Sequence, residues 1–163
     1  MPLTLSGDGS ITGGTFNRPA FRVALSATAN ISADTTTTVP FDNEEFDTNN
    51  CFSTTNYTFT PDVAGYYYVF ANVTVSTSTR PNLEDSQLQI NKNNTIVAFA
   101  EIDPSDTGEE GILTNQVSVL VEMNGTTDFL IVKTNIGIHG VTVTPQIIGG
   151  NKQTFFHGFK LAI

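Results

Sequence analysis

Hydrophobic and polar residues alternate with a period of two along most of this chain, as is typical of β-strands with one buried face. No window spaces its apolar residues by three and four, as an amphipathic helix requires. Turn signals separate the alternating segments, among them Pro61 to Gly65 and Asn124-Gly125. Strands are predicted at 21–25, 39–41, 52–59, 66–76, 88–90, 96–100, 117–121, 129–131, 141–148 and 154–163, and acidic loops at 42–47 and 101–111. The pattern predicts an all-β protein, a sandwich or jelly roll of short antiparallel strands.

The 163 residues fit one domain preceded by a short arm. Residues 1–18 are rich in Gly, Ser and Thr and offer little to pack, so we expect an arm that anchors or links. Residues 19–163 are expected to form the folded domain. The glycines of the arm do not predict a phosphate-binding loop, because no buried strand precedes them and no helix follows.

The charge balance excludes some partners. The chain carries 7 basic and 16 acidic side chains, a formal net charge of −9, and has no basic stripe to neutralise phosphates. We therefore expect no nucleic-acid partner, and no apolar stretch predicts a membrane partner. The N-terminus lacks the basic start and apolar run of a secretory signal, which favours export by packaging or lysis, or a trimmed chain. Cys51 is the single cysteine, so it is expected to be a structural thiol.

The segment 66–76 has two apolar faces over its first half. One face is expected to be core, and its residues are Tyr67, Val69, Ala71, Val73 and Val75. The other face carries aromatic residues that a single sandwich leaves outside, and aromatic patches of a few hundred Å² are seldom exposed on monomers. Self-association would cover them, although a ligand groove or an added structural layer would also do so. The predicted interface residues are Tyr66, Tyr68, Phe70 and Phe156.

A spaced motif in the same region resembles a known family. The gaps in Phe41-x5-Asp47-x4-Phe52-x6-Phe59-x5-Gly65-x-Tyr67 resemble the signature of the globular head domain of the complement component 1q family, relatives of tumour necrosis factor. The segments 88–93 and 155–161 also resemble strands of that family. At Val69 and Ala71 the family usually carries aromatic residues, and this chain does not.

The resemblance covers roughly residues 20–163 and implies a fold and an assembly. It implies a ten-stranded antiparallel jelly-roll sandwich with adjacent termini, which packs around a threefold axis into a compact homotrimer. The residues expected to form the core motif are Phe41, Asp47, Phe52, Phe59, Gly65, Tyr67, Gly158 and Phe159. The arm adds a second resemblance, because residues 3–13 look like segments of bacteriophage fibre and virion proteins.

Candidate chemistry is sparse. His139 and His157 are the available imidazoles, and neither lies in a sequence setting that suggests a base beside a nucleophile, so no enzyme is expected. No cofactor is predicted. Oxygen ligands gather at Asp103, Asp106 and Glu109, which makes them weak calcium candidates, but their spacing is not that of an EF-hand and a solvated loop is the favoured interpretation.

These observations favour a non-enzymatic bacteriophage virion protein: a trimeric fibre tip or capsid decoration head on the virion surface. Its arm would bind another virion protein, and its loops would contact a host surface glycan or protein. The alternative is a secreted, extracellular recognition module of the complement 1q type from a cellular organism. A small hydrolase or lyase on a jelly roll is a third hypothesis.

Overall fold

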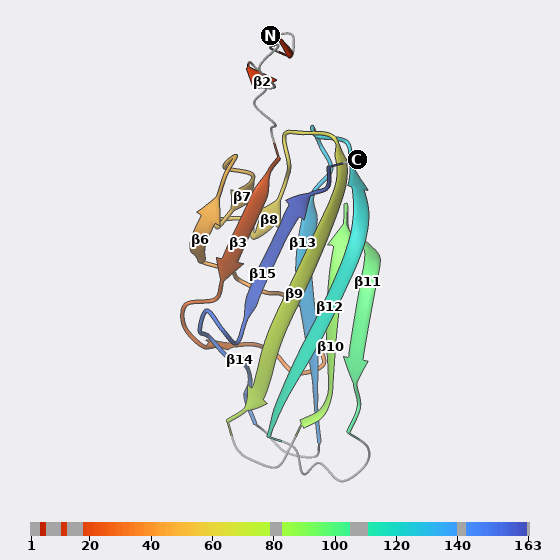
Figure 1. Ribbon diagram of the computed structural model, residues 1–163. Helices are drawn as coiled ribbons and strands as arrows, with labels where there is room; N and C mark the ends of the chain where they lie inside the picture. Colours follow the sequence, from red (N-terminus) through yellow and green to blue (C-terminus); the bar gives the residue numbers. More distant parts are fainter. Residues whose placement is uncertain are drawn as a thin grey trace.

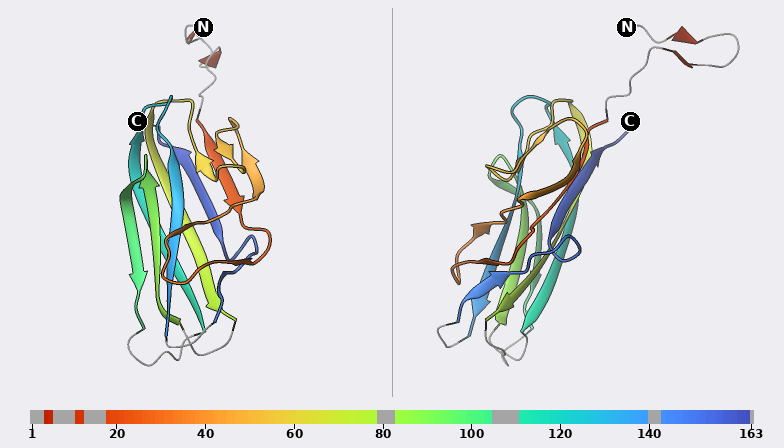
Figure 2. Two further views of the ribbon diagram at one scale, coloured as in Figure 1. Left: turned by 180° about the vertical axis from the view of Figure 1, so that it is seen from behind. Right: turned by 90° about the vertical axis from the view of Figure 1, so that its left-hand side faces the viewer.

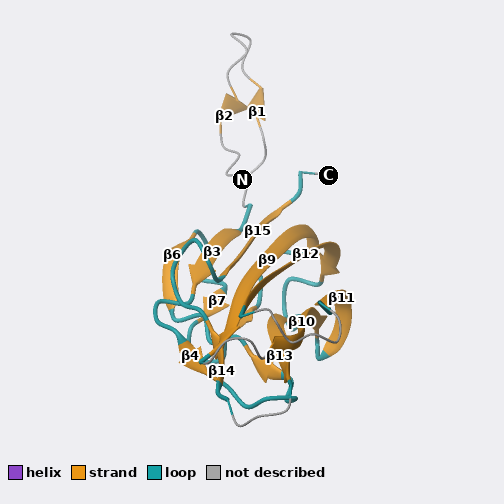
Figure 3. Ribbon diagram, turned by 90° about the horizontal axis from the view of Figure 1, so that it is seen from below, coloured by secondary structure: helices purple, strands orange, loops and turns teal. Residues whose placement is uncertain are grey.

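The computed structural model describes residues 18–78, 83–104, 111–139 and 143–162, together with the backbone of the short strands β1 (Thr4–Leu5) and β2 (Ile11–Thr12). The calcium candidates Asp106 and Glu109 and most of the predicted arm lie outside the described residues. Two antiparallel sheets are stacked face to face with a hydrophobic core between them (Figure 1). The end-on view separates a layer with β6, β3, β15, β9 and β12 from a layer with β13, β10 and β11 (Figure 3).

The first sheet, here called the β9 sheet, has the order β4-β14-β9-β15-β3-β6, with β12 on the other edge of β9. Its strands are β3 (Ala20–Ala24), β4 (Ala29–Asn30), β6 (Asn43–Asp47), β9 (Gly65–Thr77), β12 (Ile112–Met123), β14 (Pro145–Ile147) and β15 (Phe155–Lys160). β14 and β15 pair with successive parts of one edge of β9, so this long strand is the centre of the sheet.

The second sheet, the β13 sheet, has the order β11-β10-β13-β8-β7, with β5 also paired to β13. Its strands are β5 (Thr37–Thr38), β7 (Phe52–Ser53), β8 (Thr58–Phe59), β10 (Leu83–Lys92), β11 (Thr95–Ile102) and β13 (Leu130–Ile138). In the part of the chain that the structure describes, the two sheets contain seven and six strands, more than the ten strands that the family resemblance implies. All strands of both sheets pair antiparallel, as the alternating pattern predicts.

One expected loop is a strand instead. The acidic segment 42–47 was predicted to be a loop, but Asn43–Asp47 forms β6 and pairs with β3 at the edge of the β9 sheet. Charged side chains are common on edge strands because they discourage pairing with another chain. The acidic composition is therefore compatible with a strand at this position.

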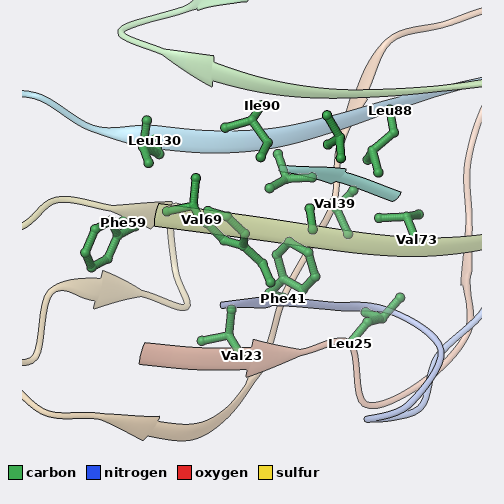
Figure 4. Packing of buried hydrophobic residues seen from close by; sticks show 14 of the residues in the cluster. Val23, Leu25, Val39, Phe41, Phe59, Val69, Val73, Leu88, Ile90 and Leu130 are labelled. Atoms are coloured by element: carbon green, nitrogen blue, oxygen red, sulfur yellow. The ribbon is translucent and has the colours of Figure 1, made fainter. Parts of the chain in front are cut away.

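Phenylalanine rings fill the core at the end of the sandwich where β3 begins. The Phe21 ring stacks on Phe59 with 4.1 Å between centroids and meets Phe156 edge-on at 4.9 Å. Phe41 lies 6.0 Å from Phe156. Figure 4 shows Phe41 and Phe59 with the aliphatic side chains that point inward from both sheets. Because these rings are buried and in contact with one another, each of them contributes substantially to stability.

Most residues of the spaced motif lie in this core. Phe41, Phe59 and Tyr67 are fully buried, Phe52 is nearly so, and the Tyr67 hydroxyl donates to the Val63 carbonyl at 2.7 Å. The other two motif positions shape the backbone. The Asp47 carboxylate accepts the amide protons of Phe52 at 2.6 Å and Asn49 at 3.1 Å, which closes the loop between β6 and β7. Gly65 begins β9 with φ of +144°, a conformation that favours glycine.

The predictions for Phe156 and Phe159 were wrong, because the two residues have exchanged environments relative to what was expected. Phe156, expected at the interface, is 1% exposed in the core, whereas Phe159, expected in the core, is 46% exposed. The reason is the register of β15, in which Phe156 lies opposite the buried Ala71 of β9 and Phe159 lies opposite Tyr68. Residues directly opposite in an antiparallel pair point to the same side of the sheet. Phe156 therefore faces inward and Phe159 outward.

The ends of the described domain lie together, as the family resemblance implies. The Lys160 amide donates to the Pro19 carbonyl at 2.9 Å, and both chain ends leave from one end of the sandwich (Figures 1 and 2). The same end holds the tip of the β12–β13 connection. There Nζ of Lys92 forms an ion pair with Oδ2 of Asp128 at 2.8 Å, and Nδ2 of Asn93 donates to Oδ1 of Asp128 at 2.8 Å. No helix among the described residues is long and apolar enough to cross a membrane.

Candidate functional site

Apolar rings gather on the outer surface of the β9 sheet, on the side that faces away from the core. The alternation along β9 and β15 turns every second side chain outward, and the pairing of the two strands sets these side chains in rows across the sheet. We call this surface the aromatic face. Its residues are Tyr66, Tyr68, Phe70, Leu120, Phe155, His157 and Phe159.

The first row of the aromatic face is apolar across three strands. Leu120 on β12 lies opposite Tyr68 on β9, and Tyr68 lies opposite Phe159 on β15. The Tyr68 and Phe159 rings have centroids 5.8 Å apart. Leu120 is 54% exposed and Tyr66, one step along β9, is 40% exposed. Large apolar side chains are therefore adjacent and open to solvent on one face of the chain.

The second row centres on His157. Its ring is nearly parallel to Phe70, with 5.3 Å between centroids and 20° between planes, and to Phe155, at 5.6 Å and 17°. Phe70 and Phe155 are themselves 5.8 Å apart. The three rings form one cluster beside the exposed first row.

Arg22 on β3 continues this row and is held from several directions. Its Nε donates to Oε2 of Glu45 at 2.8 Å, and its Nη2 donates to the Asn151 carbonyl at 2.8 Å. Its guanidinium lies 4.1 Å from the centroid of the Phe155 ring. Its Nη1 is 3.2 Å from Nδ1 of His157. Because arginine has only donors, Nδ1 is the acceptor, and His157 is the neutral tautomer with its proton on Nε2.

The surroundings of His157 disfavour its charged form. Burial of the ring lowers the pKa of His157 below its ordinary value of 6.5, and the positive charge of Arg22 lowers it further. The imidazole is therefore neutral near pH 7. A neutral, stacked histidine is compatible with burial in a protein contact.

A polar network ends the aromatic face beyond Phe70. The Asn72 amide donates to the Gln153 carbonyl at 2.6 Å, and Gln116 donates to the Asn72 side-chain oxygen at 2.8 Å. The Thr74 hydroxyl also donates to the Gln153 carbonyl, at 3.0 Å. The segment before β15 thus covers the second half of β9, which leaves the first half open.

Of the four residues predicted for the interface, Tyr66, Tyr68 and Phe70 lie together on the aromatic face, and Phe156 does not. The sequence reasoning missed the contributions of other strands, which come from Leu120, Phe155, His157 and Phe159. Phe155, His157 and Phe159 occupy alternate positions along 155–160 and therefore share one side of the strand. This signal was obscured because Phe156 places an aromatic residue on the other side as well.

The remaining candidates show no reactive arrangement. Cys51 is buried, donates to Asp62 at 3.6 Å, and has a pKa raised to about 11, chiefly by burial. His139 is exposed beyond the end of β13. Asp103 is exposed just after β11, and across the described ranges no three His, Cys, Asp or Glu residues are grouped so that they could hold a metal ion.

Comparison with known proteins identifies the fold of the chain. No family model and no curated protein matches the sequence. The globular domain of zebrafish complement 1qA protein matches with a TM-score of 0.58 and 17% identity, over 90% of this chain and 98% of that one. Murine APRIL at pH 8.5 matches with 0.61 and 10%, over 89% and 100%. Eiger TNF from S. frugiperda matches with 0.59 and 14%, over 89% and 92%. The chain therefore has the jelly-roll fold of the complement 1q globular domain and the tumour necrosis factor proteins.

Proposed function

We propose that this chain is a non-enzymatic homotrimeric head, assembled through the aromatic face, whose loops are displayed for binding. The observation that carries the proposal is the exposed row of Leu120, Tyr68 and Phe159, with Tyr66 beside it. Covering the exposed part of one such ring removes on the order of 100 Å² of apolar surface from water, which stabilises an assembly by about 2 kcal/mol. Each subunit exposes several such side chains, and covering them together is enough to stabilise a contact between subunits.

A threefold arrangement needs a second, different surface on each subunit, because the contacts of a cyclic trimer are heterologous. The edge strand β11 offers one. Ile96 is 50% exposed and Phe99 is 48% exposed on this strand. β11 and β12 lie along the same side of the sandwich (Figure 1). In the proposed trimer this edge packs against the aromatic face of the next subunit.

The chemistry of the described residues supports a binding role over catalysis. His157 accepts a hydrogen bond from Arg22 and stacks on two phenylalanines, so it is occupied as a structural group. The raised pKa of Cys51 makes its thiol a poor nucleophile at neutral pH. A head that assembles and displays its loops for binding needs neither group to react.

The finer proposal places the head on a virion surface, with residues 1–18 attached to another virion protein and the loops facing a host glycan or protein. Its support is the resemblance of residues 3–13 to phage fibre segments. The alternative is a secreted recognition module, which the similarity in fold to the zebrafish complement domain favours. Electron microscopy of particles from the source organism separates the two, because only the first places the head on a capsid or fibre.

The assembly itself is tested by measuring mass in solution. Light scattering on the full chain should report three times the chain mass of 17.5 kDa at micromolar concentration. Phe159→Asp should yield folded monomers, because it puts a charge into the contact but removes no core group. Ile112→Asp is the matched control and should leave the trimer intact, because Ile112 is also exposed, at 45%, but lies at the far end of β12 from Leu120. A monomeric parent chain would overturn the proposal.

A further inference from the structure

We propose that His157 and Arg22 form a pH-sensitive contact within the aromatic face, which loosens the assembly when His157 takes up a proton. This inference rests on the proposed trimer and adds a regulation to the same surface. It starts from the contact between Nη1 of Arg22 and Nδ1 of His157 at 3.2 Å, which exists only while Nδ1 has no proton.

Arg22 cannot easily move away from a charged neighbour. Glu45, the Asn151 carbonyl and the Phe155 ring each hold a different part of its guanidinium. His157 is equally constrained, because its ring is stacked with Phe70 and Phe155 at centroid distances of 5.3 and 5.6 Å. When His157 is protonated, its Nδ1–H therefore faces the Nη1–H of Arg22, and two positive charges lie close together. Neither side chain can easily move away. Rotation of the ring gives no relief, because both nitrogens of a protonated imidazole are donors.

Among the described residues, no carboxylate forms an ion pair with His157. The charged and titratable side chains on this surface around His157 are Arg22 on β3, Glu45 on β6, Tyr66 and Tyr68 on β9 and Glu122 on β12. The carboxylate of Glu45 is engaged by Nε of Arg22. Glu122 lies opposite Tyr66, in a different row from His157. The proton on His157 is thus opposed by Arg22 without a compensating contact in its own row.

Assembly strengthens this opposition, because a neighbouring subunit removes the water that screens the two charges. The pKa of His157 is already below 6.5 in the single subunit, and further burial lowers it again. The reference for assembly is the free subunit, so His157 stabilises the trimer fully at pH above its pKa in the free subunit. This contribution declines as the pH falls through that pKa toward the lower pKa of the trimer. The trimer is therefore expected to be tight at pH 7.5 and to weaken as the pH falls below the lowered pKa of His157 in the free subunit.

The size of the effect follows from proton linkage. Between the pKa of the free subunit and that of the trimer, each copy of His157 raises the dissociation constant by up to about tenfold per pH unit. With one histidine in each of three copies the constant rises by up to about a thousandfold, which raises the midpoint concentration for dissociation by about thirtyfold. Changes of this size are measurable.

The experiment is sedimentation velocity on the full chain over a concentration series from pH 7.5 down to pH 4.5. The range extends well below 6.5 because the pKa of His157 is already lowered in the free subunit. His157→Gln keeps an uncharged acceptor for Arg22, so this variant should trimerise without the pH response. His139→Gln changes the exposed histidine beyond β13 and should keep the response of the parent. The Cε1 proton resonance of His157 should also titrate well below pH 6.5 in the trimer.

Each outcome bears on the inference. If the trimer forms at pH 7.5 but its dissociation constant does not change over the pH range in which His157 of the free subunit takes up its proton, the inference is wrong and the proposed function stands. The inference is also wrong if His157→Gln retains the full response, because another group such as Asp85, whose pKa burial raises, would then be responsible. If no trimer forms at pH 7.5, the proposed function fails together with this inference.

Discussion

Phe156 and Phe159 lie on the same strand, and the structure predicts opposite consequences for removing their rings. Phe156 is 1% exposed and contacts the rings of Phe21 and Phe41, with centroids 4.9 and 6.0 Å away. Replacing a buried phenylalanine with alanine costs about 3–5 kcal/mol, because the lost ring leaves a cavity that its neighbours fill only in part. This is a large part of the roughly 5–15 kcal/mol by which a domain is stable. Phe156→Ala should therefore fold weakly or not at all.

The side chain of Phe159 contributes little to the stability of a single subunit. Its ring is 46% exposed and makes one aromatic contact, with Tyr68 at 5.8 Å. We expect Phe159→Ala to lower the free energy of unfolding of the subunit by about 1 kcal/mol or less, as for an exposed aromatic pair. Its main effect should be on assembly, where the contact with the next subunit is lost.

Urea denaturation measures the first quantity, at a protein concentration low enough that subunits are separate. With a slope of about 2 kcal/mol/M, Phe156→Ala should shift the midpoint down by about 2 M, and Phe159→Ala by less than about 0.5 M. Light scattering on the same samples at higher concentration measures assembly. Ile112→Ala is the control for loss of an exposed apolar side chain, because Ile112 is 45% exposed at the far end of β12 from Leu120, and it should lower neither subunit stability nor assembly. Equal destabilisation by Phe156→Ala and Phe159→Ala would refute the assigned orientation of β15.

Three further predictions concern the fold. Gly158→Ala should destabilise the subunit by about 1–3 kcal/mol in urea denaturation, because its Cβ would lie 2.6 Å from Cγ1 of Val69; an unchanged midpoint would contradict this. The Cys51 thiol should react with an aromatic disulfide reagent at pH 8 only after unfolding, since its pKa is raised to about 11; rapid reaction in the folded chain would show that the site is open. The hydrogen bond from Lys92 lowers the pKa of Asp128 below 3.8, so this carboxylate stabilises the fold above pH 4 and the contribution declines as the pH falls below it. Asp128→Asn should therefore make the acid limb of the stability profile less steep, and a profile identical to that of the parent would count against the ion pair.

The alternating pattern predicted the sheet structure well where one parity is clearly apolar. Along β9 the residues Tyr67, Val69 and Ala71 are all fully buried, and Tyr66 points outward as expected. This succeeded because β9 is the central strand and its inner face must be apolar throughout. The spaced motif performed similarly, since its aromatic positions mark rings that meet between the sheets.

The pattern was less informative at the edges of the sheets. The segment 43–47 has only one large apolar residue, Phe46, and this residue points away from the core. An edge strand is held by backbone hydrogen bonds on one side, so its side chains need no hydrophobic pattern. Pairing of this segment with β3 depends on the position of β3, which no local signal in 43–47 reports.

The orientation of β15 depends on a residue without a side chain. Aromatic residues occupy both parities between 155 and 160, so hydrophobicity alone does not select the inner face. Gly158 selects it, because its Cα faces Val69 and the ring of Phe21 so closely that a Cβ would lie 2.6 and 3.1 Å from them. Only glycine fits there, and Phe156 must then share the inner side with it.

The same glycine determines which rings the aromatic face contains. A slip of one residue in β15 would turn His157 and Phe159 into the core and Phe156 outward, because side chains alternate strictly along a strand. Arg22 would then lose the acceptor at Nδ1 of His157, and a bulky ring would occupy the space beside Phe21 that Gly158 now leaves open. Both changes oppose the slipped register. The close packing at Gly158 that stabilises the core is therefore also what presents Phe155, His157 and Phe159 together on the outer surface.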